Sequence, residues 1–130
     1  MNNAVRYYTR SGNTKGIADA LAKELGVDAI SVDNLAAAIQ DEVDVLFIGG
    51  ALYAYGIDEH LQRYLEGISK DKVKKAVVFS TSWISKHAIE LMKECLNHQG
   101  IEVDNDSFYS RGKPSASTLS KAAEFAKKYK

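Results

Sequence analysis

Short apolar runs alternate with amphipathic stripes along the whole chain. Continuous apolar or β-branched runs of this length predict strands, and apolar residues that recur every three or four positions predict helices. The predicted strands lie at residues 4–9, 27–32, 43–50, 76–79 and 101–110. The predicted helices carry stripes at residues 17–25, 61–68, 84–95 and 119–129, with a thinner pattern at 35–40 that predicts a short crossover helix. Five strands therefore alternate with five helices.

Strict alternation of strands and helices predicts an α/β fold, because parallel neighbours need helical crossovers that cover both faces of the sheet. The run VDVLFIGG at residues 43–50 is apolar or glycine apart from Asp44, as expected for a strand buried on both faces. We predict one doubly wound domain over residues 1–130, with a three-layer, five-stranded parallel sheet in the order 2-1-3-4-5. Ligands of such sheets bind at the carboxyl ends of the strands, so the loops after strands 1, 3 and 4 are the candidates.

Composition narrows the class of partner. Lys and Arg total 17, as do Asp and Glu, so the formal net charge is +0. The sequence has no cluster of basic residues that would predict nucleic-acid binding. The longest apolar run, residues 45–48, is far short of the roughly 20 residues that a membrane span needs. The single cysteine excludes an internal disulfide, and the N-terminal residues lack a signal-peptide layout. We expect a cytoplasmic protein without a membrane span.

The loop after the first strand concentrates hydroxyl, amide and glycine groups. It comprises Thr9, Arg10, Ser11, Gly12, Asn13 and Thr14. The loop leads into a predicted helix, whose first N–H groups and dipole favour an anion, and its hydroxyls can donate to phosphate oxygens. Neither the triphosphate loop nor the dinucleotide GxGxxG pattern is present. The alternative is an ordinary helix cap, for which one such residue would suffice. The pattern favours a site for one terminal phosphate.

This loop resembles the flavin mononucleotide (FMN) phosphate loop of flavodoxins, usually Ser/Thr-x-Thr/Ser-Gly-Asn-Thr. The matching residues are Thr9, Ser11, Gly12, Asn13 and Thr14. The resemblance implies that these side chains and their backbone amides surround the FMN phosphate. Arg10 stands where the family often has a small or polar residue, and a positive charge is compatible with phosphate. A solvated surface arginine is an equally good interpretation.

The loop after the third strand carries two tyrosines among small residues. It comprises Ala51, Leu52, Tyr53, Ala54, Tyr55 and Gly56. In flavodoxins this loop packs an aromatic ring on the flavin, and the resemblance assigns that role to Tyr53 or, in a longer loop, to Tyr55. Many flavodoxins have glycine directly after the stacking residue. Ala54 follows Tyr53 and resists positive φ, whereas Gly56 follows Tyr55, so the choice between the tyrosines stays open.

The loop after the fourth strand comprises Ser80, Thr81, Ser82 and Trp83. Flavodoxins use this loop to cover the second flavin face and to bind its pyrimidine edge through backbone amides. Small hydroxyl residues allow that close approach. Trp83, the only tryptophan, either covers the flavin or anchors the following helix.

The resemblance implies an FMN-binding electron-transfer protein that docks with a redox partner protein, with no side chain acting as acid or base. One alternative is an FMN-dependent NAD(P)H:quinone-type reductase, although no segment resembles a nicotinamide site. Another is a flavin-free interaction module of the same fold. Many flavodoxins are strongly acidic, whereas this chain is neutral, so we expect a less extreme reduction potential and a different partner surface.

Overall fold

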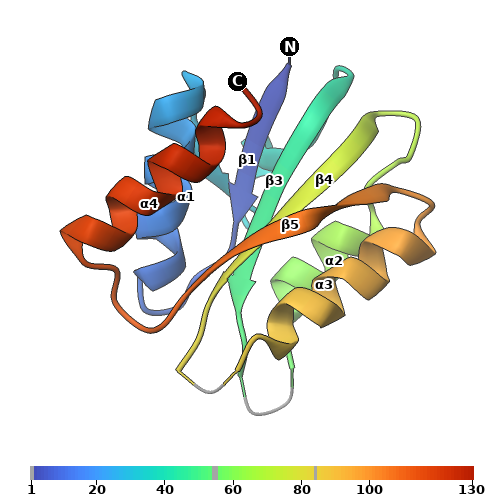
Figure 1. Ribbon diagram of the computed structural model, residues 1–130. Helices are drawn as coiled ribbons and strands as arrows, with labels where there is room; N and C mark the ends of the chain where they lie inside the picture. The colour runs from blue at the N-terminus through green and yellow to red at the C-terminus, as the bar shows by residue number, and fades with distance from the viewer. Residues whose placement is uncertain (1, 54–55, 84) are drawn as a thin grey trace.

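Five parallel strands form one sheet in the order β2-β1-β3-β4-β5, which confirms the predicted fold class and strand order. The computed structural model describes residues 2–53, 56–83 and 85–130. The strands are β1 (Asn3–Tyr7), β2 (Ala29–Ser31), β3 (Val43–Ala51), β4 (Val73–Thr81) and β5 (Glu102–Ser110). All carboxyl ends therefore point to the same edge of the sheet, at the bottom of Figure 1.

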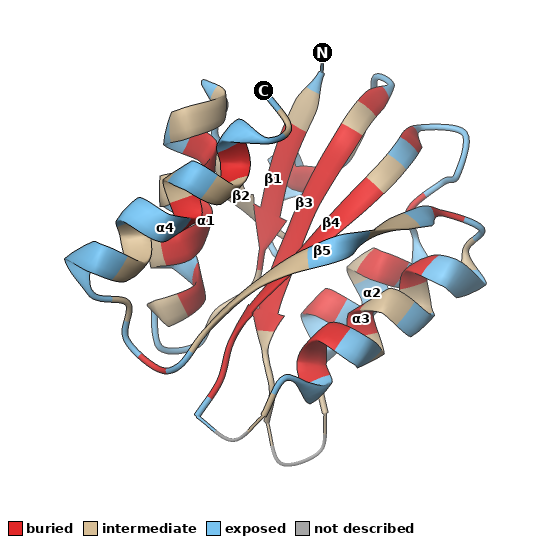
Figure 2. Ribbon diagram, viewed as in Figure 1, coloured by how far each residue is buried: buried red, intermediate tan, exposed pale blue. Residues whose placement is uncertain are grey.

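Four α-helices complete three layers. They are α1 (Asn13–Leu25), α2 (Glu59–Glu66), α3 (His87–His98) and α4 (Ala116–Lys127). Helices α1 and α4 cover one face of the sheet, while α2 and α3 cover the other (Figure 1). The central strands are buried on both faces (Figure 2), as their uninterrupted apolar runs require. Phe47 and Phe79 lie in the core on the α1 side, and Ile48 and Val78 in the core on the α2 side.

The predicted crossover helix at residues 35–40 is wrong in type and length. The structure has a single 3₁₀ turn, η1 (Leu35–Ala37), capped by the Asn34 side chain, which accepts the N–H of Ala36 at 2.9 Å. Only Ala37 is buried, while Leu35 is 96% exposed, so the segment has too few apolar contacts to stabilise helical turns. Arg6 of β1 instead holds the crossover, donating from Nε to the Ala37 carbonyl at 2.8 Å.

Helix α3 also buries a different set of residues from the one predicted. We expected Ile84, Ala88, Leu91 and Cys95 to face the core. The residues of α3 that are buried are Ala88, Ile89, Met92 and Leu96, while Leu91 and Cys95 are only partly buried. Ile84 lies outside the described residues. Two overlapping stripes compete on this helix, and packing against α2 and the sheet selects between them. No helix in the described ranges is long and apolar enough to cross a membrane.

Candidate functional site

A hollow of about 260 Å³ opens at the carboxyl edge of the sheet, where the predicted loops converge. Its lining comes from the loop after β1 (Arg10, Ser11, Asn13), the loop after β3 (Ala51, Leu52, Tyr53), the loop after β4 (Thr81, Ser82, Trp83) and the loop after β5 (Gly112). Four segments that are far apart in the sequence thus meet at one place, as the strand order requires. Tyr53 and Trp83 bring an aromatic ring to this lining from two different loops.

The loop after β1 is shaped by its own side chains. The Gly12 N–H donates to Thr9 Oγ1 at 2.9 Å, and the Asn13 N–H donates to Ser11 Oγ at 3.4 Å. Gly12 has φ +94°, a conformation that residues with a Cβ rarely adopt. The first helical bond runs from the Gly16 N–H to the Gly12 carbonyl, so the N–H groups of the preceding helical residues have no intrahelical acceptor. These donors and the helix dipole make the loop suitable for an anion.

A buried hydroxyl pair ties the loop after β1 to the end of β4. Thr14 Oγ1 and Thr81 Oγ1 lie 2.7 Å apart, and the two residues are 0% and 2% exposed. Thr81 pairs across the sheet with Ser110, whose Oγ is buried and has no hydrogen-bond partner among the described residues. The Thr14 side chain therefore links two loops beneath the hollow. The Thr14 backbone N–H belongs to the first turn of α1, where it has no intrahelical acceptor.

Arg10 turns its guanidinium toward α2. Its Nε and Nη2 donate to Asp58 Oδ2 at 3.0 and 2.6 Å, and its Cζ lies 3.9 Å from the centre of the Tyr53 ring. Asp58 is the N-cap of α2, and its Oδ1 accepts the His60 N–H at 2.7 Å. The His60 ring in turn stacks on Tyr8, with centroids 4.9 Å apart. Arg10 thus joins the loops after β1 and β3 through a charge pair.

Tyr53 is fixed from both its backbone and its ring. Its N–H donates to the Gly56 carbonyl at 2.7 Å, and its carbonyl accepts the Gly56 N–H at 3.0 Å. Gly56 has φ +120°, in the region that favours glycine. Burial raises the pKa of the Tyr53 hydroxyl above its ordinary value, although the Arg10 charge and a hydrogen bond from the Arg10 backbone partly offset the rise. The phenol therefore stays neutral at physiological pH. Ala54 and Tyr55, two predicted site residues, lie outside the described residues.

Trp83 lies at the rim of the hollow with 69% of its surface exposed. A Cβ built on Gly112 would come within 2.2 Å of the indole ring. The Trp83 ring can therefore lie against this position only because glycine has no side chain. The adjoining Ser82 N–H donates to the Ser110 carbonyl at 3.2 Å, and the Tyr109 hydroxyl donates to the Ser82 carbonyl at 2.7 Å. The loops after β4 and β5 therefore lie side by side.

Some predicted residues support the hollow without lining it, namely Thr9, Gly12, Thr14, Gly56 and Ser80. Ser80 is fully buried, and its Oγ has no hydrogen-bond partner among the described residues. Asp58, His60 and Gly112 were not among the site residues predicted from the sequence. Asp58 could have been found as an acidic residue directly before a helical stripe, which is a capping signal. The role of Gly112 depends on the position of Trp83, which no local pattern encodes.

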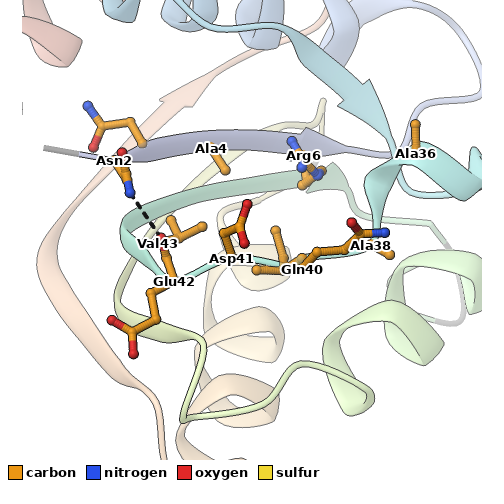
Figure 3. Close-up of a pocket in the computed structure, with 11 residues that line it drawn as sticks. Asn2, Ala4, Arg6, Ala36, Ala38, Gln40, Asp41, Glu42 and Val43 are labelled. Carbon is orange, nitrogen blue, oxygen red and sulfur yellow. Dashed lines mark hydrogen bonds between the residues drawn. The ribbon is translucent and has the colours of Figure 1, made fainter.

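A second hollow, of about 550 Å³, lies at the opposite edge, between β1 and the crossover (Figure 3). Arg6 is 9% exposed there, and its Nη1 and Nε donate to the backbone carbonyls of Val5 and Ala37. Asp41 and Glu42 belong to the same lining, so the hollow combines both signs of charge. Its hydrogen bonds hold the crossover, and it lies far from the loops at the carboxyl edge.

The strand order and the position of the hollow define a doubly wound α/β protein with a hollow at the switch point of its sheet, where such folds bind ligands. A family model described as a flavodoxin domain matches residues 4–120. The chain therefore belongs to the flavodoxin family, whose members are electron-transfer flavoproteins, as the sequence analysis predicted. No curated protein gave a significant match to the sequence. Among the described residues, no cluster of His, Cys, Asp or Glu is suited to a metal ion.

Solved structures show the same fold. A flavodoxin from the domain Archaea is 21% identical, with a TM-score of 0.76, and the match covers 97% of this chain and 94% of that one. Oxidised flavodoxin 1 from Bacillus cereus is 19% identical, with a TM-score of 0.77 and coverage of 98% and 97%. Rubredoxin oxygen:oxidoreductase from Desulfovibrio gigas is 14% identical, with a TM-score of 0.80; the match covers 97% of this chain but 34% of that larger one.

Proposed function

We propose that this chain binds FMN in the hollow at the carboxyl edge and exchanges electrons with a redox partner protein. The phosphate would lie at the loop of residues 9–14 and the start of α1. The flavin ring would lie between the loops after β3 and β4. The observation that carries the proposal is the meeting, in one hollow, of a glycine- and hydroxyl-rich loop at a helix N-terminus with the aromatic residues Tyr53 and Trp83.

The donor set fits a phosphate held without a dedicated cation. The loop offers the hydroxyls of Thr9 and Ser11, which accept backbone N–H groups and still have a proton to donate. It also offers the N–H groups of the first helical turn. Arg10, the one cation of the loop, is paired with Asp58. The phosphate would therefore be bound chiefly by neutral donors and the helix dipole.

The aromatic residues fit the other end of the cofactor. Tyr53 and Trp83 offer flat apolar surfaces with polar tips, which suit stacking on a flavin and exclusion of water from it. When bound, FMN supplies the redox-active ring, and the chain supplies binding and electrostatics. Among the described residues, the lining includes no carboxylate, histidine or cysteine.

An absorption spectrum of the purified protein with FMN, after removal of the excess, tests the proposal. We expect flavin bands near ~375 and ~450 nm to stay with the protein. Trp83, the only tryptophan, reports the same event, because a flavin beside it would quench its fluorescence. Retention of no flavin, together with unchanged Trp83 emission, would refute FMN binding. Rapid oxidation of NAD(P)H by the loaded protein would instead assign it to the reductases.

Two matched glycine variants locate the phosphate. Gly12 and Gly26 flank α1 at opposite ends, both have positive φ (+94° and +72°), and neither has an atom within 4 Å of a built Cβ. Alanine at either position carries similar backbone strain, of about 1 kcal/mol. Only Gly12→Ala disturbs the proposed phosphate loop. We expect it to weaken FMN binding at least tenfold and Gly26→Ala to leave the affinity within twofold. Equal affinities in the two variants would contradict this placement.

A further inference from the structure

Two neighbouring loops at the carboxyl edge carry positive charge and contain no carboxylate of their own. Residues 80–87 and 107–120 contain no Asp or Glu, but they contain Lys86, Arg111 and Lys113. All three side chains belong to exposed residues. Within the described part of the chain, none of them forms an ion pair with a carboxylate, whereas Arg10 is paired with Asp58. Because the net charge of the protein is +0, this is a local concentration of charge.

The fold brings these cations together around Trp83. The Trp83 ring lies against Gly112, which separates Arg111 from Lys113 in the chain. Lys86 Nζ lies 5.6 Å from the centre of the Tyr109 ring, and the Tyr109 hydroxyl donates to the carbonyl of Ser82, the residue before Trp83. We call the group formed by Trp83, Lys86, Arg111 and Lys113 the Trp83 patch. It combines an exposed aromatic centre with a cationic surround.

This composition is typical of a protein-binding surface. Tryptophan and arginine are enriched among the residues that contribute most to interfaces, and exposed charges around them accelerate encounter with an oppositely charged partner. Trp83 also lines the hollow of the candidate site, so a protein bound to the patch would lie next to the cofactor. The three cations are exposed and do not line the hollow, so their charge is available to a partner outside it.

We propose that the Trp83 patch is the docking surface for a redox partner whose contact surface is acidic. The inference rests on the proposed function, since it names the chemistry of the partner that exchanges electrons with the flavin. The sequence led us to expect a partner surface different from that of acidic flavodoxins. In this proposal, that surface is the positive charge concentrated beside the site, which acidic residues elsewhere balance to a net charge of +0.

The test compares two oxidised carriers of opposite charge, an acidic blue-copper protein and a basic c-type cytochrome. The photoreduced flavoprotein gives one electron to the oxidised metal, Cu(II) or Fe(III), and the rate is followed by stopped-flow absorbance. Since surface charges are screened over about 10 Å at 0.1 M salt, we expect the rate with the acidic carrier to fall as salt rises. The rate with the basic carrier should stay constant or rise. The opposite pattern would overturn the proposal.

Charge-neutralising variants assign the effect to the patch. The triple variant Lys86→Gln, Arg111→Gln, Lys113→Gln should lower the low-salt rate with the acidic carrier about tenfold, within the range known for electrostatic steering. Its flavin content, checked by absorbance, should not change.

The matched control removes three exposed lysines from elsewhere on the surface: Lys23→Gln, Lys70→Gln, Lys121→Gln. None of these lysines forms an ion pair among the described residues, so both triple variants lose the same net charge. The control should keep the rate within twofold of the original protein. An equal loss in both variants would show that only net charge matters and would overturn the assignment to the patch.

Calorimetric titration of the flavin-free protein with the acidic carrier provides a readout that does not need the cofactor. We expect the patch variant to bind about tenfold more weakly at low salt, which corresponds to about 1.4 kcal/mol. A chain that retains no FMN but shows this difference would refute the proposed cofactor while supporting the docking surface. If the protein retains FMN but the patch variant binds the acidic carrier as tightly as the original protein does, the result would support the cofactor and refute the docking surface. Displacement of the carrier by NADPH, with direct binding of the nucleotide, would reassign the patch to an anionic nucleotide and overturn the proposal.

Discussion

Replacing Asp58 with alanine removes the group at which two loops of the site meet. Its side chain is 6% exposed, and it caps α2 while pairing with Arg10, whose side chain is 45% exposed. Loss of an N-cap costs about 1 kcal/mol of unfolding free energy. A charge pair with one half-exposed partner is screened by solvent and contributes about 1 kcal/mol more. We therefore expect Asp58→Ala to lower the free energy of unfolding by about 2 kcal/mol.

The conservative variant separates the two contributions. Asp58→Asn keeps an oxygen that can accept the His60 N–H, so it should retain the cap. Its free energy of unfolding should fall by about 1 kcal/mol, which is the contribution of the charge pair alone. The assay is urea denaturation followed by far-ultraviolet circular dichroism. Glu59→Gln is the control, because the Glu59–Arg63 pair is highly exposed on both sides (71% and 74%) and should change stability by less than about 0.5 kcal/mol. An Asp58→Ala effect no larger than this control would refute the reasoning.

Acid should remove the contribution of the Asp58 charge. Burial by itself raises the pKa of the Asp58 carboxyl, but hydrogen bonds from His60 and Arg10 outweigh it, so the pKa in the folded protein lies below its ordinary value. A lowered folded-state pKa stabilises the protein above the unfolded-state pKa of about 3.9, and the contribution is lost as pH falls through the folded-state value. The stability difference between the original protein and Asp58→Asn should therefore shrink between pH 7 and pH 3. A constant difference would contradict the charge-pair interpretation.

Three further substitutions test other parts of the site and fold. Thr14→Val breaks the buried hydroxyl pair and leaves Thr81 without that partner, so it should cost about 1–3 kcal/mol in urea denaturation; a neutral result would mean that the pair does not form. Gly112→Ala places a methyl group where the Trp83 ring lies, and its φ of +64° adds strain, so we expect a shifted tryptophan emission maximum and a loss of at least about 1 kcal/mol. An unchanged spectrum would show that the ring does not rest there. Arg6→Met preserves much of the apolar stem but loses hydrogen bonds from a buried charged group, so it should destabilise the protein by about 2 kcal/mol and speed amide exchange in the crossover. Unaltered exchange would argue against its role in holding that segment.

The local pattern of the sequence was sufficient for the five strands, the four α-helices and their order. Uninterrupted apolar runs specify strands buried on both faces, and the alternation with helices restricts the connections to a few right-handed topologies. That order places the loops after β1, β3 and β4 at one edge, so residues such as Ser11, Tyr53 and Trp83 could be assigned to a common site before their positions were known. The phosphate-type loop was recognisable because its chemistry lies within six consecutive residues.

Tertiary structure decided the partners of those residues. Arg10 could have faced a phosphate or solvent, but Asp58, 48 positions away in the chain, holds it. The alternation of side chains along β4 sends Thr81 toward Thr14 and leaves Ser80 on the opposite face. The stripe that α3 buries and the short turn that replaces the predicted crossover helix likewise depend on neighbouring surfaces. Sequence periodicity fixes which residues share a face, whereas the contacts between distant faces are determined only when the layers pack.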